Sequence, residues 1–595
     1  MQLIKELRRR RVFRTAALYI VAAWIILQVA SLAFPALDIP DSAIRFVWIG
    51  AFLGFPIAVV FGWRYQITTE GIEKTRPLAA GEVTADLSLG RTDFILLAAL
   101  SVVLVAIAGG VIREIQSVKG PGLSVLGREI PPNSIAVLPL ENLTGNPEEE
   151  YLAIALQEAL ISDLAVISGL RVTSRTSSGR YLNSNKSIAE IGVELGVAYL
   201  VEGTMQRIGD QIRLRLQLID AELDELLWSD NYDRNLEDIL VLQGEVARTV
   251  SGELGVKLAQ DERHRLTRTR KVNPEVYKLV VKGTYFAKQL DPVGIDRGLK
   301  LLNQAISLDP REPLAYAGLA LGYNTIGHGA NAHGAFPKAK AAAQKALSLD
   351  EYSGAGWAAL GEAEMYYDWD WDKARASQLK ALQLSPSLDQ MYAHYAYLLL
   401  LYGDVDEAIS MAEKARDLSP LDPLWAGFAA WIYMLEARWE DAHQAIEECL
   451  TYSPDFSFCL YTEAQSLTAQ GKVAEALEVL ENGDRNDPFV LWALAPTYAL
   501  AGRREDALNI ARGWEAQPTT RNLMHLSFTH SALGDMDKAL RYLEQSLEAR
   551  TDWLPWIVFD NAYGGVVEPM RGHPRYQAVV DQMKLPLIRN SKLLD

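Results

Sequence analysis

The sequence predicts a mainly α-helical protein with three N-terminal transmembrane helices, a small α/β domain and a C-terminal α-solenoid of helical repeats. Three observations predict this architecture. The first 112 residues contain three long apolar runs, residues 133–260 alternate β-forming runs with amphipathic segments, and small residues and prolines then recur every 34 residues. At 595 residues the chain is also too long for one hydrophobic core.

The membrane domain is expected to cover residues 1–112, with spans at 15–34, 46–63 and 94–112. Each run has 18 to 20 residues and no charged side chain, so each is long enough as a helix to cross about 30 Å of hydrocarbon. A buried core helix is the alternative for such a run, but three runs in succession without any polar face favour membrane spans. The chain is therefore expected to be an integral membrane protein.

The basic residues predict how these spans are oriented. Six Lys/Arg residues precede the first run, and basic residues favour the cytoplasmic side. The N-terminus is therefore expected in the cytoplasm, and everything after residue 112 in the periplasm of a bacterium, beyond its inner membrane. Arg10-Arg11 and Ser31-Leu32-Ala33 leave open a cleaved signal peptide, which would put the C-terminal part on the same side.

Charge and cysteine content exclude some partners and sites. Residues 1–112 hold 11 Lys/Arg and 8 Asp/Glu, a net +3, so the remainder carries −20 of the total −17. An acidic domain of this size repels phosphate backbones, so no nucleic-acid partner is expected. The only cysteines, Cys449 and Cys459, provide neither a disulfide framework nor a metal-ligand spacing.

After a linker at 113–132, residues 133–260 show the pattern of a small α/β domain. Its strands are expected at 134–139, 170–174, 198–207 and 211–220, the last with alternating Ile212, Leu214, Leu216 and Leu218. Its helices are expected at 149–166, 187–195 and 236–258, and Ser187 with Glu190 forms a capping-box pattern.

Prolines and small residues mark the repeats. Prolines occupy positions 386, 420, 454 and 488, and alanines occupy positions 374, 408, 442 and 476. A 34-residue period with small residues where paired helices approach is typical of tetratricopeptide repeats (TPRs). About eight units are expected over 275–555, one with a Gly-rich insertion around 327–334, followed by a capping segment at 556–595.

Several motifs suggest a family. Residues 134–148 (SIAVLPLENLTGNPE), 190–203 (EIGVELGVAYLVEG) and 227–233 (LWSDNYD) resemble the TolB-like N-terminal domain found beside TPR arrays in many bacterial proteins. The segments YYDWDW (366–371) and MRGHPRY (570–576) also resemble this TolB-like/TPR membrane protein family. Ile154-Ala155 replaces the family's usual acidic-glycine pair. Relatives are sometimes labelled adenylate cyclase, but the chain has no cyclase catalytic pattern.

No motif predicts a catalytic, cofactor-binding or metal-binding site, so the chain is not expected to be an enzyme. His328 and His333 are spaced like a weak ligand pair, but no neighbouring carboxylate or thiol in the sequence completes a set. His525 and His530 are five residues apart on a predicted helix, which is a poor spacing for one shared ligand.

The repeat register predicts a partner-binding groove. The inner positions of the first helices hold Tyr397, Trp431, Tyr461 and Gln465, with Ala393 and Gly427 beside them. This aromatic, nearly uncharged surface is expected to bind an apolar or aromatic segment of a partner protein. The alternative is that these aromatic residues pack between neighbouring repeats.

The sequence leaves open whether Cys449 and Cys459 form a disulfide. They lie on helices that should stack beside each other, and a periplasmic location permits a bridge. Two buried free thiols are the alternative.

The expected function is that of a membrane-anchored interaction scaffold of the bacterial cell envelope, with a protein partner in the groove. The alternative is a sensor or regulatory subunit whose α/β domain binds a small ligand and signals through the repeats. Homo-oligomerisation stays open.

Topology reporters test the three-span prediction. Fusions after Arg64 and after Gly120 should report opposite sides of the membrane, the second non-cytoplasmic, because one span separates them. A Gly120 fusion active only as a cytoplasmic reporter would contradict the prediction.

Overall fold

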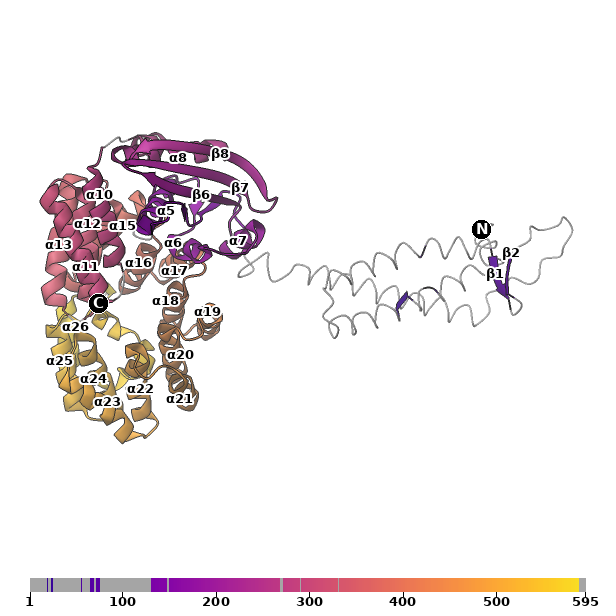
Figure 1. The fold of residues 1–595 in the computed structure, drawn as a ribbon. Helices are drawn as coiled ribbons and strands as arrows, with labels where there is room; N and C mark the ends of the chain where they lie inside the picture. Colours follow the sequence, from indigo (N-terminus) through magenta and orange to yellow (C-terminus); the bar gives the residue numbers. More distant parts are fainter. Residues whose placement is uncertain are drawn as a thin grey trace. The chain divides into compact units, whose positions relative to one another are not determined.

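A computed structural model describes residues 130–587 except 147–148, 268–270, 289–290 and 330. Before residue 130 it describes only Tyr19, Ala23, Trp24, Phe55 and two short strands. The chain divides into two compact units, Met1–Gly120 and Pro121–Asp595, each of which is described by itself (Figure 1).

In the first unit, strands β1 (Tyr65–Thr68) and β2 (Gly71–Lys74) form an antiparallel hairpin, within the stretch expected to connect the second and third spans. The three predicted spans lie almost entirely outside the described residues. Among the residues that are described, no helix is both long and apolar enough to cross a bilayer.

The second unit begins with a mixed sheet in the order β5–β3–β6–β7–β8, with β4 paired to β6. Strand β3 runs parallel to β5 and β6, whereas β6, β7 and β8 form an antiparallel meander (Figure 1). The strand bounds are β3 Ser134–Val137, β4 Glu141–Asn142, β5 Arg171–Val172, β6 Tyr199–Ile208, β7 Gln211–Asp220 and β8 Glu225–Asn235.

Helices cover the sheet, and the alternating apolar side chains of its strand β7 are buried beneath them. Ile212, Leu214, Leu216 and Leu218 of β7 are all buried, in one core with α5 (Glu150–Ala165) and α8 (Ile239–Glu253). Helix α7 (Ile188–Leu195) packs in a second core with Leu200 and has the predicted capping box at Ser187. Short helices α6 (Arg175–Ser178), η2 (Gly179–Tyr181), η3 (Leu236–Asp238) and α9 (Gln260–Leu266) complete this region.

Strand β8 is the element that the sequence pattern did not predict. Of its eleven residues only Tyr232 is buried, so polar side chains lie on both faces and no period-two pattern results. The sheet therefore ends in a long, exposed edge strand.

A solenoid of eight antiparallel helix hairpins follows, α10–α11 through α24–α25, in the part of the chain that the structure describes. Their bounds are α10 Pro274–Ala287, α11 Pro292–Leu308, α12 Pro313–Gly329, α13 Ala332–Leu349, α14 Gly354–Ala363 with the π-helix η4 Glu364–Asp368, α15 Trp371–Leu384, α16 Asp389–Tyr402, α17 Val405–Leu418, α18 Pro423–Leu435, α19 Trp439–Tyr452, α20 Ser457–Ala469, α21 Val473–Asn482, α22 Pro488–Leu500, α23 Arg504–Ala516, α24 Thr520–Ala532 and α25 Met536–Glu548.

The repeating residues act as the period predicted, with one correction. The alanines at 374, 408, 442 and 476 are fully buried, and Gly403 and Gly471 adopt the left-handed conformation that ends a first helix. Of the four prolines, only Pro488 begins a helix, because the other three lie in the preceding turns. The Gly-rich stretch 327–334 includes the end of α12 and the start of α13, which at 17 and 18 residues are longer than helices of the later hairpins, and Gly327 contacts the Phe336 ring too closely for a side chain.

The sheet region is docked on the array through backbone hydrogen bonds. The amide of Ser174 donates to the carbonyl of Leu418 (2.8 Å), and the amide of Leu421 donates to the hydroxyl of Ser177 (3.1 Å). Leu421 also joins the core beneath α7. The turn between α17 and α18 therefore fixes the sheet region to the middle of the array.

A disulfide links α19 to α20. The structure joins Cys449 to Cys459, with their Cα atoms 6.6 Å apart and both side chains fully buried. The two residues are ten apart in sequence, and they face each other because α19 and α20 pack together.

Thiol counting tests this bridge. Protein taken from cells and denatured without reductant should show no free thiol, rising to two after reduction, because the chain has only two cysteines. A Cys449→Ser, Cys459→Ser variant is the control and should show none in either state. Two free thiols before reduction would rule the bridge out.

Candidate functional site: the inner surface of the array

The first helices of successive hairpins bring aromatic residues together on the inner surface of the array. Tyr397 lies on α16, Trp431 on α18, and Tyr461 and Gln465 on α20. Tyr397, Trp431 and Gln465 follow at 34-residue intervals, so the repeat stacks them in register. The structure thus brings the four predicted groove residues onto one surface.

That surface is covered. The exposed fractions are 0% for Tyr397, 1% for Trp431, and 5% for both Tyr461 and Gln465. The cover consists of residues 553–570, which form the short helices η5 (Leu554–Val558), η6 (Ala562–Gly565) and η7 (Glu568–Met570). We call residues 553–570 the filling segment. Helix α26 (Pro574–Met583) follows it and packs against α25.

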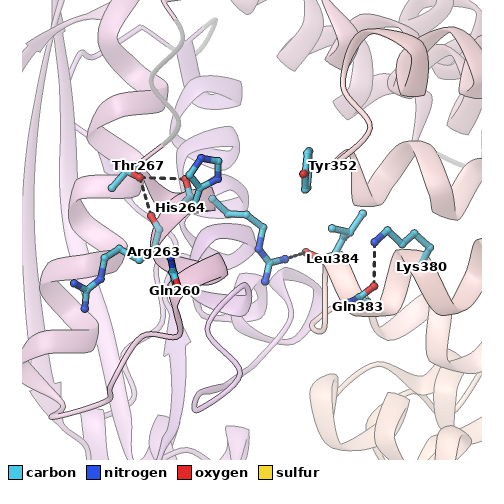
Figure 2. Close-up of a pocket in the computed structure, with 9 residues that line it drawn as sticks. Gln260, Arg263, His264, Thr267, Tyr352, Lys380, Gln383 and Leu384 are labelled. Atoms are coloured by element: carbon cyan, nitrogen blue, oxygen red, sulfur yellow. Dashed lines mark hydrogen bonds between the residues drawn. The ribbon is translucent and has the colours of Figure 1, made fainter.

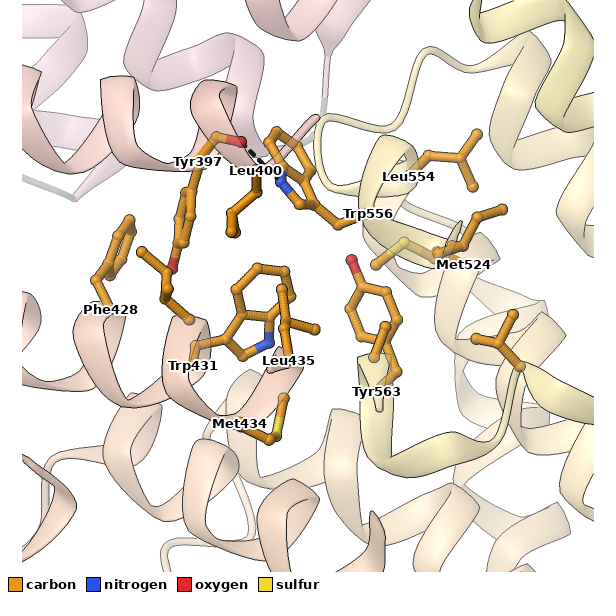
Figure 3. Close-up of a cluster of buried hydrophobic side chains, with 14 of the residues drawn as sticks. Tyr397, Leu400, Phe428, Trp431, Met434, Leu435, Met524, Leu554, Trp556 and Tyr563 are labelled. Carbon is orange, nitrogen blue, oxygen red and sulfur yellow. Dashed lines mark hydrogen bonds between the residues drawn. The ribbon is translucent and has the colours of Figure 1, made fainter. Parts of the chain in front are cut away.

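Aromatic rings make the central contacts, and Figure 3 shows Tyr397, Trp431, Trp556 and Tyr563 among them. The Tyr397 ring lies 5.4 Å from that of Trp553 and 5.8 Å from that of Trp556, between ring centroids, and Trp431 lies 5.5 Å from Trp553. The Trp556 indole N–H donates to the carbonyl of Tyr397 (3.2 Å), and Tyr563 stands 6.2 Å from Trp431. These separations are those of favourable edge-to-face and tilted ring pairs.

The structure therefore does not have the expected open partner-binding groove at Tyr397, Trp431, Tyr461 and Gln465. The filling segment occupies the surface in cis, and residues 556–570, expected to be part of a terminal cap, lie inside the array. The repeat register correctly predicted which residues face inward. The repeat register contains no information about which segment of the chain covers these residues. The only sign of the filling segment in the sequence is the unusual pair Trp553 and Trp556.

A buried ionic network holds the start of the filling segment. The Nδ1 atom of His328 on α12 lies 3.0 Å from an Asp552 carboxylate oxygen, and its Nε2 lies 3.2 Å from Glu362 of α14. Arg521 of α24 donates to Asp552 (2.7 Å), and Asn324 donates to Glu362 (2.8 Å). Three helices and residue 552 thus meet at one point.

The network is balanced in charge. Burial opposes protonation of His328, but its hydrogen bonds to Asp552 and Glu362 outweigh this and raise its pKa to about 9. Burial also opposes ionisation of the two carboxyls, but their cationic and hydrogen-bonded neighbours lower both pKa values. His394, which accepts from or donates to the hydroxyl of Tyr366 at 2.7 Å, is kept neutral because burial lowers its pKa to about 4.

This arrangement fixes positions rather than performing chemistry. His328 is held between two carboxylates, which leaves its nitrogens no free position for a substrate. Across the described residues, no group of three His, Cys, Asp or Glu side chains is placed to hold a metal ion. His333 points elsewhere, to the hydroxyl of Tyr367 and the carbonyl of Glu548, so the two histidines are not a ligand pair.

Nothing in the sequence indicated the two carboxylates beside His328, because both are distant from it along the chain. Glu362 lies 34 residues away and Asp552 lies 224 residues away. His525 is also separate from His530: its ring stacks on Trp492 at 5.1 Å, and burial with the nearby Arg521 lowers its pKa to about 3.

Family models match two parts of the chain. The model described as the HilA/YgeH-like transcriptional regulator, second domain, matches residues 132–249, and a tetratricopeptide repeat model matches residues 520–552. The TPR assignment is thus supported directly at α24–α25. The sheet region matches the HilA/YgeH-like model and not the TolB-like domain that its motifs suggested.

One curated relative is the Rhizobium meliloti (strain 1021) protein named "Putative adenylate cyclase 3". It is 38% identical over 188 residues, which is 32% of this chain and 32% of that protein. The chain thus matches about a third of the relative's length.

Among solved structures, a thermophilic TPR protein of Thermus thermophilus is 18% identical with a TM-score of 0.28, over 32% of this chain and 98% of that one. Pseudomonas aeruginosa PilF is 18% identical with a TM-score of 0.29, over 36% and 92%. A human IFIT1 dimer with m7Gppp-AAAA is 15% identical with a TM-score of 0.34, over 52% and 78%. At these TM-scores the likeness supports no conclusion about this chain.

Burial of the inner surface predicts a stability defect. The Trp431→Ala variant should lose about 3–5 kcal/mol of unfolding free energy, because it removes a fully buried ring and leaves a cavity. Urea unfolding measures this loss of free energy, and limited proteolysis within residues 553–570 follows the filling segment. Tyr352→Ala, which removes a ring that is 46% exposed, is the control. An unchanged Trp431→Ala midpoint would contradict the packing.

The ionic network predicts a pH dependence. Because the pKa of His328 is raised from 6.5 to about 9, its contribution is complete below pH 6.5 and is lost as the pH rises through 9. His328→Gln should lower the unfolding free energy by about 3 kcal/mol at pH 7, and the difference from the parent should shrink by pH 10. Urea titrations at several pH values measure this difference. His333→Gln is the matched control, and a His328→Gln difference that does not change with pH would contradict the assignment.

Proposed function

We propose that this protein is a membrane-tethered protein–protein interaction scaffold whose partner binds the exposed edge of the sheet. The three apolar runs of residues 1–112 support the tether. The TPR-type array supports a role in protein–protein interaction, since such arrays commonly serve as binding frameworks. Because the filling segment occupies the inner surface, the proposed contact lies elsewhere.

The exposed strand β8 is the observation that carries this proposal. It is eleven residues long, and within the described part of the chain it pairs with β7 along one side only. Proteins usually shorten, twist or cover such edges, because the unpaired backbone groups attract another strand. Leucines also lie exposed at its start, where Leu226 is 53% and Leu227 41% exposed, and Leu223 in the preceding turn is 68% exposed.

The charge of β8 favours a basic partner strand over a second copy. Antiparallel pairing of two full-length β8 strands would put Asp230, the central residue, opposite itself, and like charges facing each other destabilise a ladder. Glu225 and Asp230 are both exposed on this strand. We therefore propose an extended partner segment that alternates apolar and cationic residues, added by strand pairing.

A pair of matched double variants tests this site. Leu226→Lys with Leu227→Lys should reduce co-purification of the partner from native membranes by at least tenfold, because it removes apolar contact and adds positive charge that repels a cationic segment. Leu308→Lys with Leu379→Lys is the control, since these leucines are 59% and 45% exposed on the array. Both proteins should keep the parental melting temperature.

The direct readout is hydrogen exchange at β8. A nine-residue peptide that alternates Val and Lys should slow amide exchange in residues 225–235 of the full chain, and an alternating Val and Glu peptide should not. Equal partner loss in both double variants, or no added protection with the basic peptide, would refute the β8 site. Dimerisation through β8 would instead identify a second copy as the occupant.

A further inference from the structure

A cleft with a volume of about 440 Å³ lies where the sheet region meets the middle of the array. It is lined by the chain around residue 131, the loop between α5 and β5, the turn before α16, and parts of α16 and α17. None of these elements belongs to β8 or to the filling segment. Pockets of about 300–1,000 Å³ are typical of small-molecule sites, and junctions between domains are common places for them.

Much of the cleft wall is apolar. Its apolar lining includes Pro131, Pro132, Leu170, Val172, Pro386 and Leu418. Proline rings are rigid, so three prolines present an apolar surface that loses little freedom when a ligand binds. The cleft therefore suits a molecule with an apolar body.

Hydrogen bonds between the sheet region and the array fix the walls of this cleft. Arg171 of β5 donates to the carbonyl of Gly196 (2.7 Å) and to that of Asp417 near the end of α17. Arg265 of α9 donates to the carbonyl of Leu384 (3.2 Å), just before the turn that lines the cleft, as drawn in Figure 2. These bonds hold the cleft in shape, which lowers the entropy cost of binding.

Two polar side chains of the lining come from one helix hairpin. Helices α16 and α17 pack antiparallel, so Tyr392 near the start of α16 and Lys414 near the end of α17 lie at the same end of the hairpin. Both side chains are half-buried. Among the described residues, neither side chain makes a hydrogen bond or an ion pair, and Glu413 beside Lys414 is engaged with Arg416 and Tyr433. Burial raises the pKa of Tyr392, so its hydroxyl keeps its proton for donation.

We propose that this cleft binds a small carboxylic acid with an apolar body, such as an aromatic acid. The carboxylate would lie between the Lys414 ammonium and the Tyr392 hydroxyl, which form strong hydrogen bonds with an anionic oxygen, and the body would lie against the prolines. One ammonium group balances one negative charge. A doubly charged phosphate would leave a charge unbalanced in a mainly apolar cleft, which is costly. This site does not depend on the proposed partner strand at β8.

Equilibrium binding to the full chain in detergent tests the proposal, with hydrocinnamate, its neutral amide, acetate and a peptide ending in phenylalanine as probes. Hydrocinnamate should bind saturably in the millimolar range or tighter. The amide and acetate should bind at least tenfold more weakly, because the amide lacks the charge and acetate lacks the apolar body. Bound hydrocinnamate should also slow hydrogen exchange at the Ser174 amide, which donates to the Leu418 carbonyl, since the ligand contacts both walls.

Single variants separate the charge from the packing. Lys414→Met keeps the apolar stem, so it should weaken hydrocinnamate binding at least tenfold and leave binding of the amide unchanged. Tyr392→Phe should weaken hydrocinnamate binding about threefold, because it removes one hydrogen bond. Lys300→Met is the control, since Lys300 is 71% exposed on α11, and it should leave the affinity unchanged. If Lys414→Met lowers the melting temperature, Lys414→Gln replaces it, with the same loss expected.

Three results would overturn the assignment of a small-acid site. These are no saturable binding of hydrocinnamate, equal binding of hydrocinnamate and its amide, and equal losses in Lys414→Met and Lys300→Met. Binding of the peptide alone would overturn it as well, because the ligand would then be a chain terminus rather than a small acid.

Discussion

The packing of Trp553, Trp556 and Tyr563 against the inner surface of the array is the interaction on which the rest of the second unit depends. A TPR-type solenoid is ordinarily stabilised only by neighbouring repeats. Here one segment contacts α16, α18 and α24 at once, so repeats far apart in sequence share a core. The aromatic surface is therefore a structural core of the array.

The same packing brings the second hairpin, α12–α13, to the last one, α24–α25. The Thr520 hydroxyl donates to the carbonyl of Gly329 (3.2 Å), and the imidazole of His333 bonds the carbonyl of Glu548 (2.8 Å). Asp552 is fixed between His328 of the second hairpin and Arg521 of the last. Burying these charges has a large desolvation cost, which only complete pairing offsets, so the network favours one arrangement of the helices.

With its inner surface filled and its sheet region docked on the α17–α18 turn, this unit presents external surfaces in fixed relation to one another. The acidic edge strand β8 is one of these external surfaces. Fixed geometry of this kind is what an interaction scaffold requires.

The sequence by itself determined the repeat architecture, because a 34-residue period needs only local information: small residues where two helices touch and a turn after each. It also determined β7, whose apolar residues Ile212, Leu214, Leu216 and Leu218 alternate, and which aromatic side chains face inward. Only the tertiary structure decided that Tyr397 and Trp431 are core residues and that Glu362 and Asp552 flank His328. Each of these depends on segments distant in sequence, up to 224 residues for His328 and Asp552. A periodic pattern constrains how neighbouring helices pack but not which distant segment returns to meet them.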